Sequence, residues 1–345
     1  MALAQRVLDL VNIPSESGSE AQVHAYVEAS VPLEVAFTDG ESTIFAKRSG
    51  KPLILLAGHT DTVPAQGNLP GRIEDGWVAG LGASDMKGGL GVMIELGRWA
   101  AETELAHDLA LLFFPREELG PAENPLPGVF ERSGLVDEAQ LVICLEPTDN
   151  TLQLGCLGNL NARVVFEGKS AHSARPWLGV NAISLALDGL RPVLDAEPRD
   201  VDIDGLVFRE VISVTQFNAG IATNVIPARA EATLNFRYAP DRTPESAVAR
   251  VRELVGRDVG ILANSPPAHV ALHSPAVERL RAAGGFAVEP KQAWTNVADF
   301  AARGLDAVNL GPGATRYAHA VDERVEIAEL ERTFSALQSF LLGTV

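Results

Sequence analysis

Short, continuous runs of apolar residues are the clearest pattern in the first half of the chain. Three of them, at residues 52–58, 108–114 and 141–145, read PLILLAG, DLALLFF and LVICL. Such runs are typical of central strands that are covered on both faces. Residues 88–102, GGLGVMIELGRWAAE, instead have apolar positions at helical spacing. Strands that alternate with helices predict an α/β sheet with helices on both of its faces.

After Gly158 the pattern changes to an alternation of apolar and polar residues. NARVVFEG and ARAEATLNFRY alternate as half-exposed strands do. A helical stretch, NAISLALDGLRPVL, lies between them, and a second one, PESAVARVRELV, precedes the strand-like DVGILA. The order β-α-β-β-α-β is that of a ferredoxin-like α+β domain. We therefore expect this domain at residues 159–268, inserted in a discontinuous α/β domain of residues 1–158 and 269–345.

The composition restricts the classes of protein to which the chain can belong. Its 345 residues suit two domains, and its net charge of −17 argues against binding to nucleic acid. No apolar run approaches the length of a membrane span, about 18 residues. Arg6 and Asp9 interrupt the first apolar residues, which favours an amphipathic helix over a signal peptide. Cys144 and Cys156 are expected to be buried thiols, not a disulfide, so we expect a cytoplasmic protein.

Ionisable residues follow the apolar runs or precede the glycine-rich helix. In open α/β sheets, ligands bind beyond the carboxyl ends of the strands. The residues at such positions are His59, Asp61, Asp85, Glu117, Glu118, Glu146 and His319. Singly, each has an ordinary explanation: a hydrogen-bonded histidine, a helix N-cap or a solvated carboxylate. Together they predict one cluster that needs a cation, because like charges repel and desolvation adds to the penalty.

The residue types in this cluster indicate which metal it binds. Mixed histidine and carboxylate ligands favour zinc, for which cobalt or manganese can substitute. Two zinc ions about 3.5–4 Å apart need roughly this number of ligands, with one carboxylate bridging them. His59 is a predicted ligand, and Asp61 can reach back to orient its imidazole. Of Glu117 and Glu118, one would bind metal and the other would remain a general base for a water molecule.

Seven motifs, in order along nearly the whole chain, resemble the di-zinc aminoacylase and carboxypeptidase family of metallohydrolases. They are GHTDTVP, GASDMKGG, EELG, LEPT, GKSAHSARPWLGVNA, TNVIPARAEATLNFRY and AHAVDE. GNLPGR, AHSARPWLGVNAI and RYAPDR are most similar to succinyl-diaminopimelate desuccinylases of the short form found in actinobacteria. The resemblance implies a three-layer zinc-hydrolase domain with an inserted ferredoxin-like domain that serves as a lid and forms a homodimer.

The resemblance also implies a role for each residue of the cluster. His59 and Glu146 would hold one zinc ion, and Glu118 and His319 the other. Asp85 would bridge the two ions, and the peptide bond after this aspartate is often cis in the family.

Four catalytic and substrate-binding functions are implied in the same way. Asp61 would orient the first histidine, and Glu117 would be the general base and then the acid that protonates the leaving amine. His172 resembles a histidine that crosses into the partner's active site and stabilises the oxyanion. Asn224 and Arg237 resemble substrate-binding residues, and Arg175 could also bind a substrate carboxylate, because the guanidinium fork matches a carboxylate. Plainer explanations stay open: GKSAHSA could be a simple turn, and Arg237 a surface cation.

The implied reaction is hydrolysis of an N-acyl amide bond, with N-succinyl-LL-2,6-diaminopimelate of lysine biosynthesis as the first candidate substrate. Desuccinylases usually have an arginine just before the phenylalanine of WTNVADF, where this chain has Asp299, and Asn296 departs as well. The alternative substrates are therefore another N-acyl amino acid, such as acetylornithine or an acyl-lysine, or a dipeptide. A non-catalytic binding relative is a further alternative, against which the presence of Glu117 argues, because a binding protein needs no free base.

Overall fold

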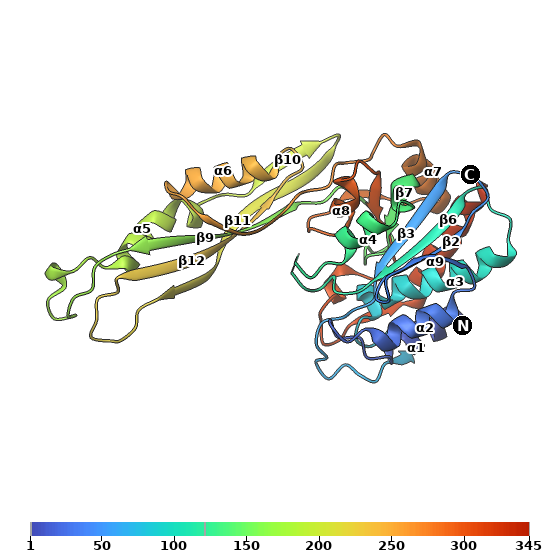
Figure 1. The fold of residues 1–345 in the computed structure, drawn as a ribbon, viewed down its shortest axis with the longest axis horizontal. Coiled ribbons are helices and arrows are strands. Elements are labelled where there is room, and N and C mark those ends of the chain that lie inside the picture. The colour runs from blue at the N-terminus through green and yellow to red at the C-terminus, as the bar shows by residue number, and fades with distance from the viewer. Residues whose placement is uncertain (1, 121, 345) are drawn as a thin grey trace. The chain divides into compact units, whose positions relative to one another are not determined.

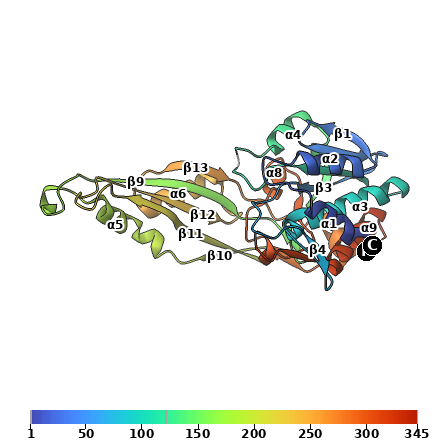
Figure 2. The same ribbon diagram turned by 90° about the horizontal axis from the view of Figure 1, so that it is seen from below.

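Two compact units make up the structure, a computed structural model that describes residues 2–120 and 122–344. The first unit consists of Met1–Gly155, Ala271–Glu289 and Asp299–Val345. The second consists of Cys156–Val270 and Pro290–Ala298, so it includes a segment that the sequence pattern assigned to the α/β domain. Each unit has its own sheet and its own helices (Figures 1 and 2).

An eight-stranded sheet forms the centre of the first unit, in the order β1-β2-β6-β3-β7-β15-β8-β14. Strands β6, β3, β7 and β15 are parallel to their neighbours within this set. Every residue of β3 and β6 is buried, as the continuous apolar runs predicted. The strands are β1 (Glu34–Thr38), β2 (Thr43–Lys47), β3 (Leu53–His59), β6 (Asp108–Phe114), β7 (Ala139–Cys144), β8 (Leu152–Leu154), β14 (Val288–Pro290) and β15 (Ala307–Asn309).

Helices α1, α3 and α9 of the first unit pack against one another beside this sheet (Figure 1). Glycines in α3 permit the close approach: a Cβ atom on Gly91 would lie 2.6 Å from Val7 Cγ2, and one on Gly97 would lie 2.9 Å from Leu111 Cδ1. The helices are α1 (Ala2–Val11), α2 (Ala21–Ser30), α3 (Gly88–Glu102), α4 (Leu126–Arg132), α7 (Pro275–Gly284) and α9 (Ile327–Leu342), and α8 (Val297–Ala301) includes residues of both units.

A small three-stranded sheet, in the order β16-β5-β4, joins two segments of the first unit that are distant in sequence. Its strands are β4 (Arg72–Glu74), β5 (Trp77–Ala79) and β16 (Arg324–Glu326). Arg324 is paired with Ala79 across the sheet. This pairing holds the residue before β16, Glu323, near the segment that follows β5 and leads to Asp85.

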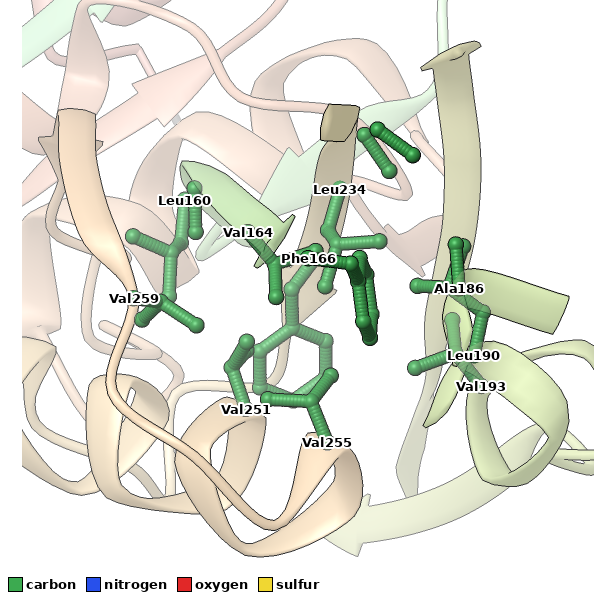
Figure 3. Close-up of a cluster of buried hydrophobic side chains, with 14 of the residues drawn as sticks. Leu160, Val164, Phe166, Ala186, Leu190, Val193, Leu234, Val251, Val255 and Val259 are labelled. Atoms are coloured by element: carbon green, nitrogen blue, oxygen red, sulfur yellow. The ribbon is translucent and has the colours of Figure 1, made fainter. Parts of the chain in front are cut away.

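The second unit is a five-stranded antiparallel sheet, in the order β10-β11-β12-β9-β13, with two helices packed against it. Alternate residues of β9 and β12 are buried, and they form one core with α5 and α6 (Figure 3). The elements are β9 (Gly158–Glu167), α5 (Ala182–Leu194), β10 (Arg199–Ile203), β11 (Leu206–Ala219), β12 (Arg229–Tyr238), α6 (Pro244–Val255) and β13 (Gly260–Ser265). The predicted fold class is confirmed, with β10 as an additional strand.

Two smaller expectations concern the thiols and the membrane. Cys144 and Cys156 are both buried and form no disulfide, as predicted. The longest helix that the structure describes, α9, has 16 residues, and within residues 2–120 and 122–344 no helix has the length and apolar character needed to cross a membrane.

Candidate metal and catalytic site

His59 ends β3 at the carboxyl edge of the parallel strands and is almost completely buried. Its Nδ1 atom lies 3.1 Å from the backbone carbonyl oxygen of Asp61 and 3.4 Å from that residue's carboxylate. Its Nε2 atom lies 3.2 Å from Asp85 Oδ1. Burial alone would lower the pKa of His59, but the contacts with Asp61 and Asp85 raise it well above its usual value. Asp61 therefore fixes the ring, and Nε2 points toward the carboxylates.

The buried carboxylate of Asp61 connects His59 with the next loop of the site. Its Oδ2 accepts hydrogen bonds from Ser17 Oγ at 2.7 Å and from the Glu118 backbone N–H at 3.1 Å. Its Oδ1 accepts one from the Glu117 backbone N–H at 3.0 Å. Burial opposes ionisation, but hydrogen bonds from His59, Ser17 and Glu117 outweigh it and lower the pKa of Asp61 to about 2. The ionised carboxylate thus holds the Glu117–Glu118 turn beside His59.

A second buried carboxylate, that of Glu323, holds the segment that carries Asp85. Glu323 Oε1 accepts hydrogen bonds from the backbone N–H groups of Ser84 at 3.1 Å and Asp85 at 2.9 Å, and Oε2 accepts one from Gly82 at 2.8 Å. The peptide bond between Asp85 and Met86 is cis. Burial raises the pKa of Glu323 to about 7, against the lowering effect of these backbone hydrogen bonds. The sequence indicated no role for Glu323, since backbone donors leave no side-chain motif; its only signal is its place in AHAVDE.

Glu118 and His319 form the other side of the cluster. His319 Nε2 lies 2.9 Å from Glu118 Oε1 and 3.5 Å from Asp85 Oδ2. Burial alone would lower the pKa of His319, but the neighbouring carboxylates Glu118 and Asp85 raise it. Asp85 therefore directs one oxygen toward each histidine, Oδ1 toward His59 and Oδ2 toward His319. This is the geometry expected of a carboxylate that is shared by two cations.

The cluster contains three overlapping groups of three residues each. Within each group, the possible ligand atoms lie within 4.8 Å of one another. The groups are His59, Asp85 and Glu146; Asp85, Glu118 and His319; and His59, Glu117 and Glu118. Burial raises the pKa of Glu117 well above its usual value and also raises that of Glu118, and the neighbouring carboxylates add to both effects. A cation would remove this penalty. The imidazole nitrogens and carboxylate oxygens of the first two groups therefore fit two divalent metal ions.

The remaining predicted site residues lie in the second unit. His172 and Asn224 lie on adjacent exposed segments, which are joined by a hydrogen bond of 3.0 Å from the Ser173 N–H to the Asn224 carbonyl oxygen. Arg175 follows on the same segment and is exposed. Arg237 is half-buried and is the ninth residue of β12. This strand begins at Arg229, five residues after Asn224. About 26 Å of extended strand separates it from the start of β12, so the structure does not bring Arg237 close to His172.

Comparisons with known proteins agree with this picture. The sequence profile of "Peptidase family M20/M25/M40" matches residues 55–343. A Mycobacterium tuberculosis (strain ATCC 25618 / H37Rv) protein, provisionally named succinyl-diaminopimelate desuccinylase DapE, is 39% identical over 344 residues, which cover 97% of this chain and 96% of that protein. The succinyl-diaminopimelate desuccinylase of Corynebacterium glutamicum is 35% identical over 355 residues, with 99% and 95% covered. The crystal structure of aminopeptidase PepT from Bacillus cereus ATCC 10987 has a TM-score of 0.79 at 21% identity and covers 99% of this chain and 97% of its own.

The fold, the ligand cluster and the relatives together define the class of protein: it is a metal-dependent amidohydrolase that acts on linear amides. The histidines and carboxylates of the cluster come from strand ends and loops that are far apart in sequence, and the fold of the first unit brings them together. The chain belongs to peptidase family M20/M25/M40. The resemblance inferred from the sequence motifs is thereby confirmed, as is the prediction that the protein is an enzyme.

Proposed function

We propose that the enzyme hydrolyses the N-acyl amide bond of N-succinyl-LL-2,6-diaminopimelate, a reaction of lysine biosynthesis. The observation that carries the reaction type is that two candidate metal-ligand groups share Asp85, while Glu117 lies in a third group with His59 and Glu118, which belong to the first two. The choice of substrate is supported by the names of the relatives that are 39% and 35% identical. Two buried cysteines without a disulfide support a cytoplasmic location, which we also propose.

A substrate screen on the purified, metal-loaded protein tests this proposal. Its members are N-succinyl-diaminopimelate, N-acetylornithine, an N-acyl-lysine and a dipeptide, and the first is expected to have the highest kcat/KM.

Asp299 stands where desuccinylases usually have an arginine, and it accepts a hydrogen bond of 3.0 Å from Asn124 Nδ2. Asn124 Oδ1 in turn accepts one from the Leu126 N–H at the start of α4. The aspartate thus has a local structural role. If the enzyme prefers another compound of the screen, that compound replaces N-succinyl-diaminopimelate as the proposed substrate, and the proposed reaction type stays the same.

The two metal ions are proposed to be zinc, with His59 and Glu146 on one, Glu118 and His319 on the other, and Asp85 on both. Support comes from the donor types and from the distances within each group. When bound, such ions act as Lewis acids, which polarise the acyl carbonyl group and lower the pKa of water. Asp61 keeps the His59 ring in place through Nδ1, which leaves Nε2 to face the metal.

Glu117 is proposed as the group that moves the proton. Its backbone N–H is fixed by Asp61, and its carboxylate oxygen lies within 4.8 Å of ligand atoms of His59 and Glu118. Burial raises the pKa of the Glu117 carboxyl group, which makes its carboxylate a stronger base. Glu117 would take a proton from the attacking water and pass it to the amide nitrogen. The C–N bond then breaks, and the amine leaves as a neutral group.

A homodimer formed through the second unit is proposed to complete the active site. Large apolar side chains near His172 are exposed, with Trp177 at 75% and Ile221 at 87%, and clusters of this kind mark interfaces. A small substrate that contacts Arg237 cannot reach His172 of the same chain, because about 26 Å of strand separates Arg237 from the segment of His172 and Asn224. His172 would therefore stabilise the oxyanion in the partner's site, where Arg175 and Asn224 of the same segments would also bind substrate, and Arg237 would bind the substrate of its own chain.

His172→Ala is expected to lower kcat about 100-fold without changing the metal content, because it removes an oxyanion donor but no metal ligand.

If His172 acts across the dimer, the His172→Ala and Glu117→Gln variants should complement each other. When equal amounts of the two variants are unfolded together and refolded, about one quarter of the wild-type activity should return, since half of the dimers are mixed and each has one complete site. Each variant refolded alone is the control. No gain on mixing would show that His172 does not act across a dimer.

Glu323→Gln is expected to weaken zinc binding about 10-fold to 100-fold, the usual effect of changing a partner that orients a metal ligand. The amide offers only one acceptor oxygen where the carboxylate offers two, so it cannot satisfy all three N–H donors of the Asp85 segment. Titration calorimetry of metal-free protein with zinc measures the change. Asp322→Asn, at the exposed neighbouring position, is the control, and equal affinities for both variants would contradict the role of Glu323.

A further inference from the structure

Four polar side chains share the face of the second unit's sheet that lies opposite its helices. In β9 and β12 the buried positions alternate with Asn159, Asn161, Asn235 and Arg237. Asn235 is paired with Asn161 and Arg237 with Asn159 across the two strands. The four side chains are therefore neighbours on one face of the sheet, the face opposite the buried core.

One amide connects all four side chains. Asn235 Oδ1 accepts a hydrogen bond of 3.0 Å from Arg237 Nε, and Asn235 Nδ2 donates bonds of 2.8 Å to Asn159 Oδ1 and 2.8 Å to Asn161 Oδ1. An arginine Nε can only donate, so the oxygen of Asn235 has to face Arg237. Both amide hydrogens of Asn235 are then committed to the two asparagines of β9. The orientation of this amide is thus fixed from both sides.

Arg237 itself has the features of a site that receives an anion. It lines a cavity of about 490 Å³, together with apolar residues and with an Asp200–Arg209 ion pair. Within the part of the chain that the structure describes, no carboxylate forms an ion pair with Arg237. Burial accordingly lowers the pKa of its guanidinium, and no neighbouring acid opposes this effect. A half-buried cation without a counter-charge is unfavourable unless a ligand supplies the charge.

We infer that Asn235 is a positioning residue, which aims the guanidinium of Arg237 at a carboxylate of the substrate. Because Nε is bound to Asn235, the two Nη atoms form the end of the guanidinium that is left to take a carboxylate in a bidentate manner. Asn159 and Asn161 act through Asn235, because they keep its oxygen turned toward Arg237. This inference rests on the proposed function, since it requires that Arg237 bind substrate.

The test compares N-succinyl-diaminopimelate with analogues in which one carboxylate at a time is a carboxamide. Arg237→Leu first identifies the carboxylate concerned, because the analogue lacking it should be hydrolysed equally well by wild type and variant. Asn235→Ala is then expected to raise KM for the full substrate about 10-fold, with kcat within a factor of two, and to leave KM for that analogue unchanged. Asn218→Ala, at an exposed asparagine of β11, is the control and should change neither value.

Each outcome separates this inference from the proposal on which it rests. If Arg237→Leu fails to distinguish the full substrate from every analogue, Arg237 does not bind a carboxylate, and the substrate-binding proposal is wrong. If Arg237→Leu does distinguish them but Asn235→Ala affects full substrate and analogue alike, Asn235 is only structural. Should Asn235→Ala not fold, the double variant N159A/N161A releases the Asn235 amide and should raise KM selectively for the full substrate. Equal effects on both compounds would again overturn the inference.

Discussion

Glu117→Gln is expected to lower kcat about 100-fold to 10,000-fold while the protein retains its metal ions. The range is the usual contribution of a positioned general acid or base. Glutamine keeps the shape of the side chain and the backbone N–H bond to Asp61, but it cannot accept a proton. The ligand groups built on Asp85 do not include Glu117, so metal binding should be unaffected. Steady-state kinetics and elemental analysis of the same preparation measure both quantities.

A matched control for this substitution is available in the same loop. Glu123→Gln removes an exposed carboxylate and should leave both kcat and metal content at the wild-type level. Near wild-type turnover of Glu117→Gln would remove this residue from the proton transfer. Loss of metal from Glu117→Gln would instead mean that Glu117 is a ligand, as its membership of the group with His59 and Glu118 permits.

The central elements of the fold could be predicted from the sequence because burial leaves a simple pattern. Residues 108–114 and 88–102, predicted as a strand and a helix, are β6 and α3 with the same bounds. After Asp108, the remaining residues of β6 are all apolar, which is typical of a strand that is covered on both faces. The strand β10 could not be predicted in this way. Its five residues, RDVDI, include only two apolar ones, Val201 and Ile203, and only Val201 is buried, so the alternation is too short to identify this edge strand.

The ligand residues of the candidate site could be predicted from their side-chain types and positions. Contacts that involve backbone groups could not. The ends of strands identified His59 and the carboxylates, because parallel strands bring their carboxyl ends to one edge. We expected the Asp61 carboxylate to orient His59, yet the nearer acceptor for Nδ1 is the backbone carbonyl, at 3.1 Å against 3.4 Å. The carboxylate also binds the N–H groups of Glu117 and Glu118. The spacing of residue types cannot reveal such backbone partners, and Glu323 escaped prediction for the same reason.

Asp85→Ala is expected to lose both metal ions, whereas His319→Ala should lose only one. Asp85 belongs to both ligand groups, with Oδ1 at 3.2 Å from His59 Nε2 and Oδ2 at 3.5 Å from His319 Nε2. Removing a shared carboxylate takes a ligand from each ion and leaves the remaining side chains too few to hold either firmly. Elemental analysis after dialysis measures the number of ions per chain, and turnover of Asp85→Ala should fall at least as far as that of Glu117→Gln.

The pair of variants distinguishes a shared ligand from a merely local one. Asp75→Asn, at an exposed turn of the same unit, should keep the wild-type metal content and serves as the control. If Asp85→Ala and His319→Ala each lose one ion, Asp85 serves a single metal, and the paired site has to be reassigned. If Asp85→Ala retains the full number, the short distances around this aspartate reflect hydrogen bonding among protonated groups instead. The metal count therefore tests the one geometric feature, a carboxylate with an oxygen toward each histidine, on which the dinuclear site depends.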